Sequence, residues 1–186
     1  MKLSILLLVS VATITPLNLH AQEVPPFPAP PKDFSATTMV APAGEPGERL
    51  VITGTAYKAD GKTPFASIVL YVYQTDASGV YNKTDGSWQR PRLRGWVKTD
   101  RNGKYKINTI KPGSYPNSKN PAHIHAIAQL PGEQPKWIDD FLFDGDPYLS
   151  ERDRKQSADL GRFSHIMKTW REPDGLLRAE RDIVLK

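Results

Sequence analysis

The chain of 186 residues contains no cysteine, and this absence restricts both its chemistry and the way it can be stabilised. Disulfide bonds, thiolate metal ligands and cysteine nucleophiles are all excluded. A serine hydrolase is not indicated either, because no Gly-x-Ser-x-Gly segment occurs. The fold must therefore rest on a hydrophobic core, and the chain is long enough to form one domain with such a core.

Basic blocks are missing as well. The chain has 25 Lys and Arg against 20 Asp and Glu, for a formal net charge of +5, but these charges are scattered. Nucleic-acid binders concentrate basic residues and interleave them with aromatic ones, so we expect no nucleic-acid partner. The positive excess is expected to serve solubility or the attraction of small anionic molecules.

The N-terminus has little charge, since Lys2 is followed by an apolar run over residues 3–11 and the composition changes after Ala21. This run is too short to span a bilayer, and a small residue at its end is typical of an export signal. We therefore expect residues 1–21 to be a signal peptide. The mature protein would be exported, periplasmic or secreted, with no membrane association once the signal is removed.

Residues 22–47 are rich in proline and small residues, so no regular ladder or helix is expected there. We interpret them as an extended arm that packs on the domain or on a neighbouring subunit, which suggests a homo-oligomer. From residue 48 onward, alternating β-branched segments are separated by turns, and Asn102-Gly103 is typical of a hairpin. The strands are expected at 49–57, 66–73, 95–100, 104–110, 123–130, 137–143 and 181–186. Residues 151–175 are expected to form a loop with one helical turn near 150–155, so residues 48–186 would form an all-β sandwich.

Candidate metal ligands lie close together between Lys111 and His125. On a strand, His123 and His125 point to the same face with Cα atoms about 6.5–7 Å apart. Tyr115 stands before Pro116 and is expected on a loop. Imidazole suits zinc, copper, iron and nickel alike, so the histidines alone leave the metal open.

A second tyrosine, Tyr81, follows the second expected strand. Taken alone, either tyrosine is typical of a structural residue at a strand end. A phenol ionises at about pH 10 in water, so a tyrosinate ligand at neutral pH needs a strong local cation. Ferric iron would supply it, because two tyrosinates and one hydroxide offset its three charges while two imidazoles complete five positions. Zinc sites rarely use phenolate.

In their order along the chain, these motifs resemble the intradiol ring-cleavage dioxygenases, and the protocatechuate 3,4-dioxygenase branch looks nearest. The segments that carry the resemblance are Gly-Glu-Arg-Leu-Val-Ile-Thr-Gly-Thr-Ala-Tyr at 47–57, Gly-Val-Tyr at 79–81, Arg-Leu-Arg-Gly-Trp at 92–96, Pro-Gly-Ser-Tyr-Pro at 112–116 and Pro-Ala-His-Ile-His at 121–125. The resemblance implies a mixed β-sandwich holding one non-haem Fe(III) through Tyr81, Tyr115, His123 and His125. It also implies the cleavage of a catechol by O2 between its two hydroxylated carbons, with a cis,cis-muconate as the product.

Four residues are assigned catalytic roles on the same basis. Tyr81 is expected to leave the metal when substrate binds and to take up a catechol proton. Asn120 stands where the family commonly has arginine, and Asp140 where it has glutamine. Arg94 could supply the missing positive charge or pair with Asp140, although a water-facing Arg94 and a solvated Asp140 are the simpler alternatives.

A different class of protein, an exported β-sandwich binding module without catalysis, would fit the strand pattern equally well. Such a module has no reason to place Tyr81 near the two histidines, so the position of Tyr81 distinguishes the two. The ring substituent stays open between protocatechuate, catechol, hydroxyquinol and larger exported aromatic compounds. His165 is expected to be a surface or packing residue.

Overall fold

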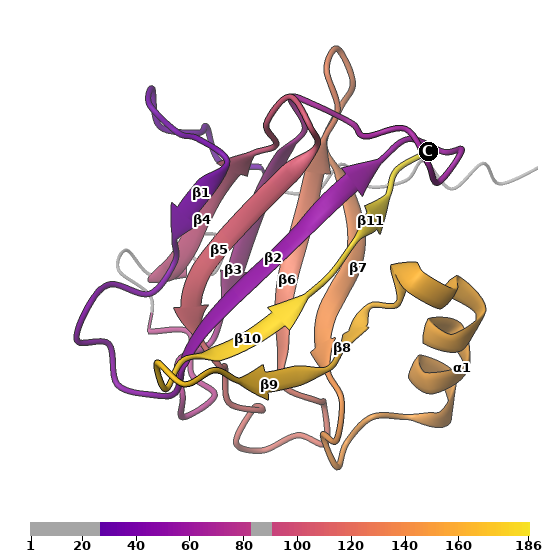
Figure 1. The fold of residues 1–186 in the computed structure, drawn as a ribbon. Coiled ribbons are helices and arrows are strands. Elements are labelled where there is room, and N and C mark those ends of the chain that lie inside the picture. Colours follow the sequence, from indigo (N-terminus) through magenta and orange to yellow (C-terminus); the bar gives the residue numbers. More distant parts are fainter. Residues whose placement is uncertain (1–26, 83–90) are drawn as a thin grey trace, which may run out of the picture.

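The computed structural model describes residues 27–82 and 91–186, which form two facing β-sheets and one α-helix (Figure 1). The signal-peptide prediction falls outside these residues. One sheet has the order β1-β5-β2-β10-β9, with β11 also pairing β2, and the other has the order β4-β3-β6-β7-β8. The strands are β1 Thr37–Met39, β2 Arg49–Tyr57, β3 Val69–Gln74, β4 Leu93–Lys98, β5 Lys104–Ile110, β6 His123–Gln129, β7 Lys136–Phe143, β8 Ile166–Met167, β9 Thr169–Arg171, β10 Leu177–Glu180 and β11 Ile183–Val184.

The expected fold class is confirmed, and the alternation of side chains explains it. Along β2, Leu50, Ile52 and Ala56 face the opposing sheet and are buried, as are Ile124 and Ala126 of β6 from the other side. The two inner faces share one apolar core, as expected of a sandwich. Parallel pairs (β1 with β5, β10 and β11 with β2, and β7 with β8) make the sheets mixed.

The expected hairpin at Asn102-Gly103 is wrong in its pairing. The turn is present, since the Asp100 carboxylate accepts from the Asn102 and Lys104 amides and Gly103 has a φ of 71°. The strands on either side of it belong to different sheets, because β4 pairs with β3 and β5 pairs with β2 and β1. The segment therefore crosses from one layer of the sandwich to the other.

Strand bounds differ from the expected ones where local backbone intervenes. The second strand begins at Val69 instead of 66, because Ser67 has a φ of 62° and breaks the extended run. Within the proline-rich arm, β1 pairs with β5, so the expectation that the arm forms no ladder was wrong there. The stretch 37–39 lies between two proline clusters and contains none itself.

The helical turn expected near 150–155 is present but belongs to a longer helix, α1 (Glu151–Leu160), and the expected loop over the rest of 151–175 was wrong, because this segment contains the strands β8 and β9. A capping box between Ser150 and Asp153 starts α1, and Lys155 pairs with Asp159 along it. Only Ser157 of the helix is buried, so its apolar period in the sequence is weak. The capping box and the i,i+4 ion pair stabilise this helix in place of a buried apolar face.

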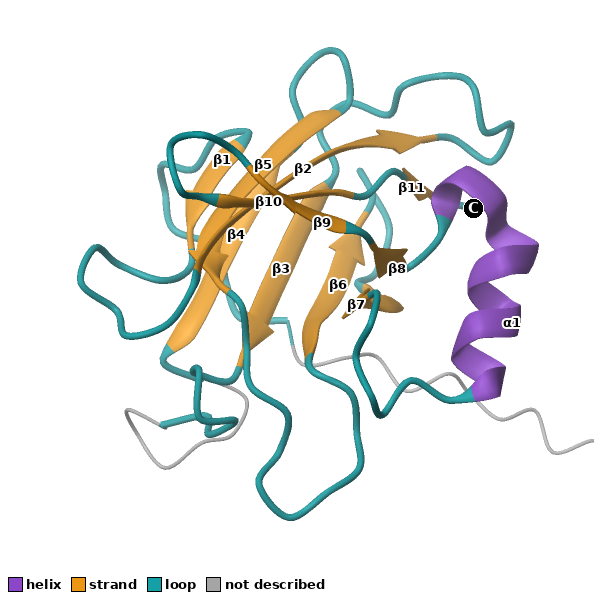
Figure 2. Ribbon diagram, turned by 60° about the horizontal axis from the view of Figure 1, so that its bottom comes forward, coloured by secondary structure: helices purple, strands orange, loops and turns teal. Residues whose placement is uncertain are grey.

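In Figure 2, α1 stands beside the β7–β8 edge of the five-stranded sheet. Within the described ranges, no helix is long and apolar enough to cross a membrane. The candidate ligands lie on the outer face of the five-stranded sheet, since the inner face is taken by the core.

Candidate metal centre

The strand β6 positions both histidines. Ile124 and Ala126 point into the core, so His123 and His125 project from the opposite face, as period-two alternation requires. Their rings meet edge to face with centroids 4.4 Å apart, and their Nε2 atoms are 3.1 Å apart. The two imidazoles are therefore aimed at one point.

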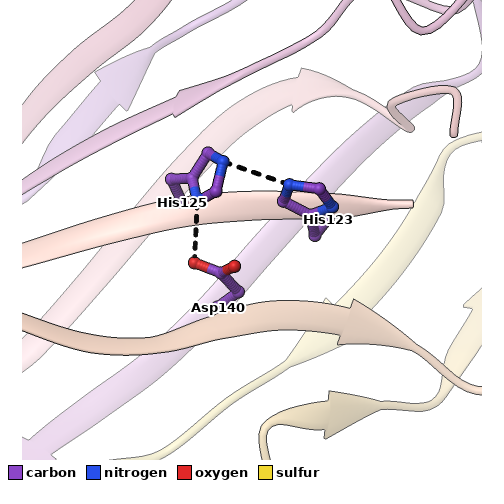
Figure 3. A group of neighbouring side chains, drawn as sticks. All are labelled: His123, His125 and Asp140. Atoms are coloured by element: carbon purple, nitrogen blue, oxygen red, sulfur yellow. Dashed lines mark hydrogen bonds and ion pairs between the residues drawn. The ribbon is translucent and has the colours of Figure 1, made fainter. Parts of the chain in front are cut away.

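The other nitrogen of each ring is engaged by an oxygen. His123 Nδ1 donates to the Pro121 carbonyl at 2.7 Å, and His125 Nδ1 donates to the Asp140 carboxylate at 2.9 Å (Figure 3). A proton on Nδ1 leaves the lone pair of a neutral imidazole on Nε2, which is the form that binds metals. Both Nε2 lone pairs thus point at the same place.

The two tyrosines come from loops that are packed backbone against backbone. The Asp76 carboxylate accepts from the Ser78 and Val80 amides and shapes the turn before Tyr81. An added Cβ at Gly79, where φ is 83°, would lie 1.9 Å from the Ser114 carbonyl oxygen of the Tyr115 loop. An added Cβ at Gly113 would lie 2.5 Å from the Ala77 carbonyl oxygen. Glycine at both positions is what allows the loops to approach.

The four side chains expected as ligands converge. The Tyr81 and Tyr115 hydroxyls are 2.7 Å apart, and the Tyr115 hydroxyl lies 3.0 Å from His123 Nε2 and 3.4 Å from His125 Nε2. Atoms each about 2 Å from one ion at angles near those of a tetrahedron or octahedron are separated by about 2.8–3.4 Å. Two phenol protons cannot satisfy every lone pair directed here, so the donor set suits a cation.

Burial makes these phenols harder to ionise without a cation. It raises the pKa of Tyr81, and the hydrogen bond to Tyr115 raises it further. Burial also raises the pKa of Tyr115, against the effect of the bond from Tyr81, and it lowers the pKa of His123, which keeps that ring neutral. Without an ion, both phenols would stay protonated at neutral pH, and a hard trivalent ion is the partner that two phenolates suit best.

Asp140 acts on His125 from behind. Asp140 forms a ligand-type cluster with the two histidines, but its oxygen contacts Nδ1 of His125, on the far side of the ring from Nε2 (Figure 3). It therefore cannot share the ion that Nε2 would bind, and its partner is an imidazole. The alternative of a merely solvated Asp140 is wrong.

The other predicted catalytic residues are placed differently. Arg94 lies opposite Tyr73 on β4, with β3 between it and His125, and donates to the Pro91 carbonyl at 2.6 Å. It is not among the described residues that line the cleft at the ligands, and it lines a separate depression with Trp96. Asn120 is exposed and does line the cleft.

This cleft has a volume of about 500 Å³ and runs from the ligands to the start of α1. It is lined by Tyr115, Lys119, Asn120, Pro121, His123, His125, Asp139, Asp140, Leu142, Tyr148, Ser150, Asp153, Gln156 and His165. Tyr115 is in this set and Tyr81 is not. Among the described residues, the cleft thus reaches Tyr115. The expectation that Tyr81 gives way to substrate stays a prediction.

Several residues around the ligands and the cleft were missed from the sequence. Tyr73 pairs across the strands with His125, and their ring centroids are 4.7 Å apart; its two-residue spacing from Tyr71 was the available signal. Asp153 lay in the helical turn expected near 150–155, and Tyr148 precedes it, but nothing in the sequence indicated that this segment lies beside the ligands. His165 is 3% exposed, which agrees with a packing role, yet it also lines the cleft.

Fold and ligand set together define a β-sandwich in which two tyrosines and two histidines converge over one sheet. The model of a family described as "Dioxygenase" matches residues 24–186. The chain belongs to this family, the intradiol ring-cleavage dioxygenases. The binding-module alternative is not favoured, because Tyr81 lies beside Tyr115 and the histidines.

Two curated relatives are similar over part of their length. The chain is 31% identical over 121 residues to catechol 1,2-dioxygenase 2 of Acinetobacter lwoffii, covering 56% of this chain and 43% of that one. It is 35% identical over 131 residues to the protocatechuate 3,4-dioxygenase beta chain of Burkholderia cepacia, covering 64% and 55%. The chain thus spans about half the length of the curated relatives that it matches.

Among solved structures, the dioxygenase domain of a dioxygenase carbohydrate-binding protein fusion from Streptomyces sp. SirexAA-E is similar with a TM-score of 0.62 and 26% identity. The match covers 86% of this chain and 93% of that one. A domain of nearly the same extent therefore has this fold in another protein.

Proposed function

We propose that the protein is an exported, non-haem Fe(III)-dependent dioxygenase that cleaves a catechol between its two hydroxylated carbons. One observation supports this proposal most directly, namely the convergence of two phenol oxygens and two imidazole nitrogens. The phenol oxygens are 2.7 Å apart, the Tyr115 oxygen lies 3.0 and 3.4 Å from the two Nε2 atoms, and these Nε2 atoms are 3.1 Å apart. The family supports it, since relatives are called catechol and protocatechuate dioxygenases.

Tyr81, Tyr115, His123 and His125 would hold the iron. Bound ferric iron would supply the electron-withdrawing centre that opens a catecholate to O2. The reaction consumes one catechol and one O2, breaks the bond between the oxygenated carbons and leaves both oxygen atoms in a cis,cis-muconate product.

Tyr115 is the phenol that faces the cleft, and we assign to it the uptake of a proton from a catechol hydroxyl. Its oxygen is 2.7 Å from that of Tyr81, so a proton can be passed between the two phenols. The half-buried Tyr73 and His125 rings pack against each other at 4.7 Å and exclude water from one side. Asp140 keeps His125 oriented with Nε2 toward the site.

The test is oxygen uptake by iron-loaded protein supplied with catechol. We expect one O2 consumed per catechol and a ring-opened dicarboxylic acid by mass spectrometry, with both atoms of labelled O2 in the product. Ring opening next to, and not between, the hydroxylated carbons would contradict the proposal, as would the absence of uptake in protein that holds iron. Tyr115→Phe should lower turnover by about 100-fold, within the usual contribution of a positioned proton acceptor.

A further inference from the structure

The cleft beyond the four ligands is large enough to hold more than a catechol ring. Its volume is about 500 Å³, within the range of roughly 300–1,000 Å³ that pockets for drug-sized ligands span. It extends from Tyr115 and the histidines past Asp139 and Asp140 to Ser150 and Asp153 at the start of α1. A ring bound at the ligands would therefore direct a substituent toward these walls.

Acidic side chains dominate those walls. Asp139, Asp140 and Asp153 line the cleft, and Lys119 is the one lysine or arginine among the lining residues in the described part of the chain. The net charge of +5 for the whole chain is thus not reproduced at the cleft. Local charges govern what enters a pocket more strongly than distant ones, which solvent and salt screen.

Asp153 is ionised and fixed in place. Its carboxylate accepts from the Ser150 amide at 2.9 Å and from the Ser150 hydroxyl at 2.7 Å. Burial raises the pKa of Asp153, but these hydrogen bonds outweigh it and hold the pKa below its usual range. The Asp139 carboxylate accepts from the Gln156 side-chain amide at 3.0 Å. The partners of Asp153 and Asp139 in these bonds are neutral groups, so the bonds leave both negative charges in place.

Two features of the structure would favour an anion in the cleft, but neither adds a positive side chain to its lining. The start of α1 carries the positive end of the helix dipole, but Glu151 and Asp153 stand in its first turn and Asp153 already accepts the Ser150 amide. Arg181 donates to the Asp139 carbonyl at 2.6 Å from behind β7, and it is buried and does not line the cleft.

His165 adds a neutral polar contact. It is 3% exposed, lines the cleft, and has an Nδ1 atom without a hydrogen-bond partner among the described residues. Burial lowers the pKa of this imidazole, so it offers no positive charge at neutral pH. The Asn120 amide and the Tyr148 ring also line the cleft and carry no charge, so Lys119 is the one positive side chain among its described lining residues.

We propose that this cleft selects catechols whose ring substituent is neutral or cationic and disfavours those bearing a carboxylate. This rests on the proposed function, because it concerns the substrate of the same site. A benzoate-type substrate would bring its anion toward Asp139 and Asp153, whereas an amide, alcohol or amine would find acceptors there.

The experiment measures binding of three catechols of similar size to iron-loaded protein without oxygen, by the change in visible absorbance. The probes are 3,4-dihydroxybenzamide, 3,4-dihydroxybenzoate and 3,4-dihydroxybenzylamine. We expect the benzoate to bind on the order of tenfold more weakly than the benzamide, the size expected for a like charge at several ångströms near a protein surface. The benzylamine should bind at least as well as the benzamide, and high salt should reduce both differences.

Charge-neutral variants assign the effect. Asp153→Asn keeps an oxygen that can accept from Ser150, and it should reduce the benzoate penalty by about threefold or more. Asp159→Asn is the matched control, because Asp159 lies on the same helix, pairs with Lys155 and does not line the cleft. It should leave the penalty unchanged.

Equal or tighter binding of the benzoate overturns the inference. If that binding is then lost in Lys119→Met, Lys119 is the residue that binds the carboxylate. A penalty that persists in both Asp153→Asn and Asp139→Asn also overturns it. The salt dependence of the unaltered protein gives the same information if a variant fails to fold. Oxygen uptake with unsubstituted catechol reports separately on the proposed function, so a failure of one is distinguishable from a failure of the other.

Discussion

The two halves of the ligand set are built in different ways. His123 and His125 stand on a regular strand, and a single oxygen acceptor holds each ring from behind. Tyr81 and Tyr115 stand on two loops that contact each other directly, at Gly79 and Gly113. Strand geometry is robust to single changes near it, whereas the loop half depends on two positions that tolerate no side chain. An added side chain at Gly79 or Gly113 should therefore disturb the loop half of the site.

The largest effect should come from removing a strand ligand. His125→Ala takes away one imidazole and leaves Asp140 without its partner, so iron affinity should fall by at least about 100-fold, more than an outer partner contributes. Iron content per chain after dialysis measures it. His165→Gln changes a histidine outside the ligand set and should retain iron. Equal iron content in His125→Ala would remove this residue from the site.

The loop half is tested by a pair of glycine substitutions. Gly79→Ala and Gly132→Ala both place alanine at a positive φ, 83° and 79°, but an added Cβ meets the Ser114 carbonyl at Gly79 and nothing at Gly132. Positive φ costs about 1 kcal/mol in each. The clash should bring the loss in Gly79→Ala to about 2–4 kcal/mol. Urea unfolding measures both, and equal losses would show that the loops are not held by this contact.

Asp140→Asn tests the acceptor behind His125. The asparagine oxygen can still accept from Nδ1, so the ring keeps its orientation and loses only the neighbouring negative charge. We expect turnover or iron affinity to fall by about 10-fold, at the lower end for such partners. Asp144→Asn is the control, since Asp144 is exposed and its carboxylate accepts only from the Gly145 amide in the described contacts. The same loss in both variants would refute a specific role for Asp140.

The smallest effect concerns pH and the metal-free protein. Burial lowers the pKa of both His123 and His165. The unfolded chain therefore binds protons at a higher pH than the folded one, so stability should fall as pH drops below about 6.5, the pKa of an unperturbed histidine. Denaturant midpoints between pH 7.5 and 5.5 should show this loss, and His165→Gln should make it smaller. A midpoint that rises on acidification would reverse the sign.

Much of the strand half could be predicted from the sequence. The bounds of β2 and β5 agree with the expected 49–57 and 104–110, and the alternation in β6 placed both imidazoles on one face. These predictions succeeded because period-two burial is local and a sandwich core enforces it. The family motifs around Tyr81 and Tyr115 indicated these two loop residues as ligands, which alternation along a strand could not do.

The remaining errors have a common physical origin in long-range contacts. The turn at Asn102-Gly103 is local, but whether its flanking strands pair depends on partners elsewhere in the chain, here β3 and β2. The helix α1 is polar nearly all round, so it depends on capping and on its position beside β8. Because its full extent was not predicted, the acidic wall of the cleft was missed. Arg94 was considered as a source of positive charge at the metal because of its sequence neighbours, beside the simpler alternative that it faces water, and β3 lies between it and His125.

The most direct test of the metal centre is the colour of the protein. After reconstitution with ferric iron, the purified protein should hold about one iron per chain and be red to purple, because tyrosinate-to-iron charge transfer absorbs visible light. Tyr81→Phe and Tyr115→Phe should each weaken this absorption while Tyr148→Phe, at the rim of the cleft, leaves it unchanged. A colourless protein with ferric iron bound, or a coloured one indifferent to both substitutions, would contradict the assignment of two tyrosines and two histidines to one iron.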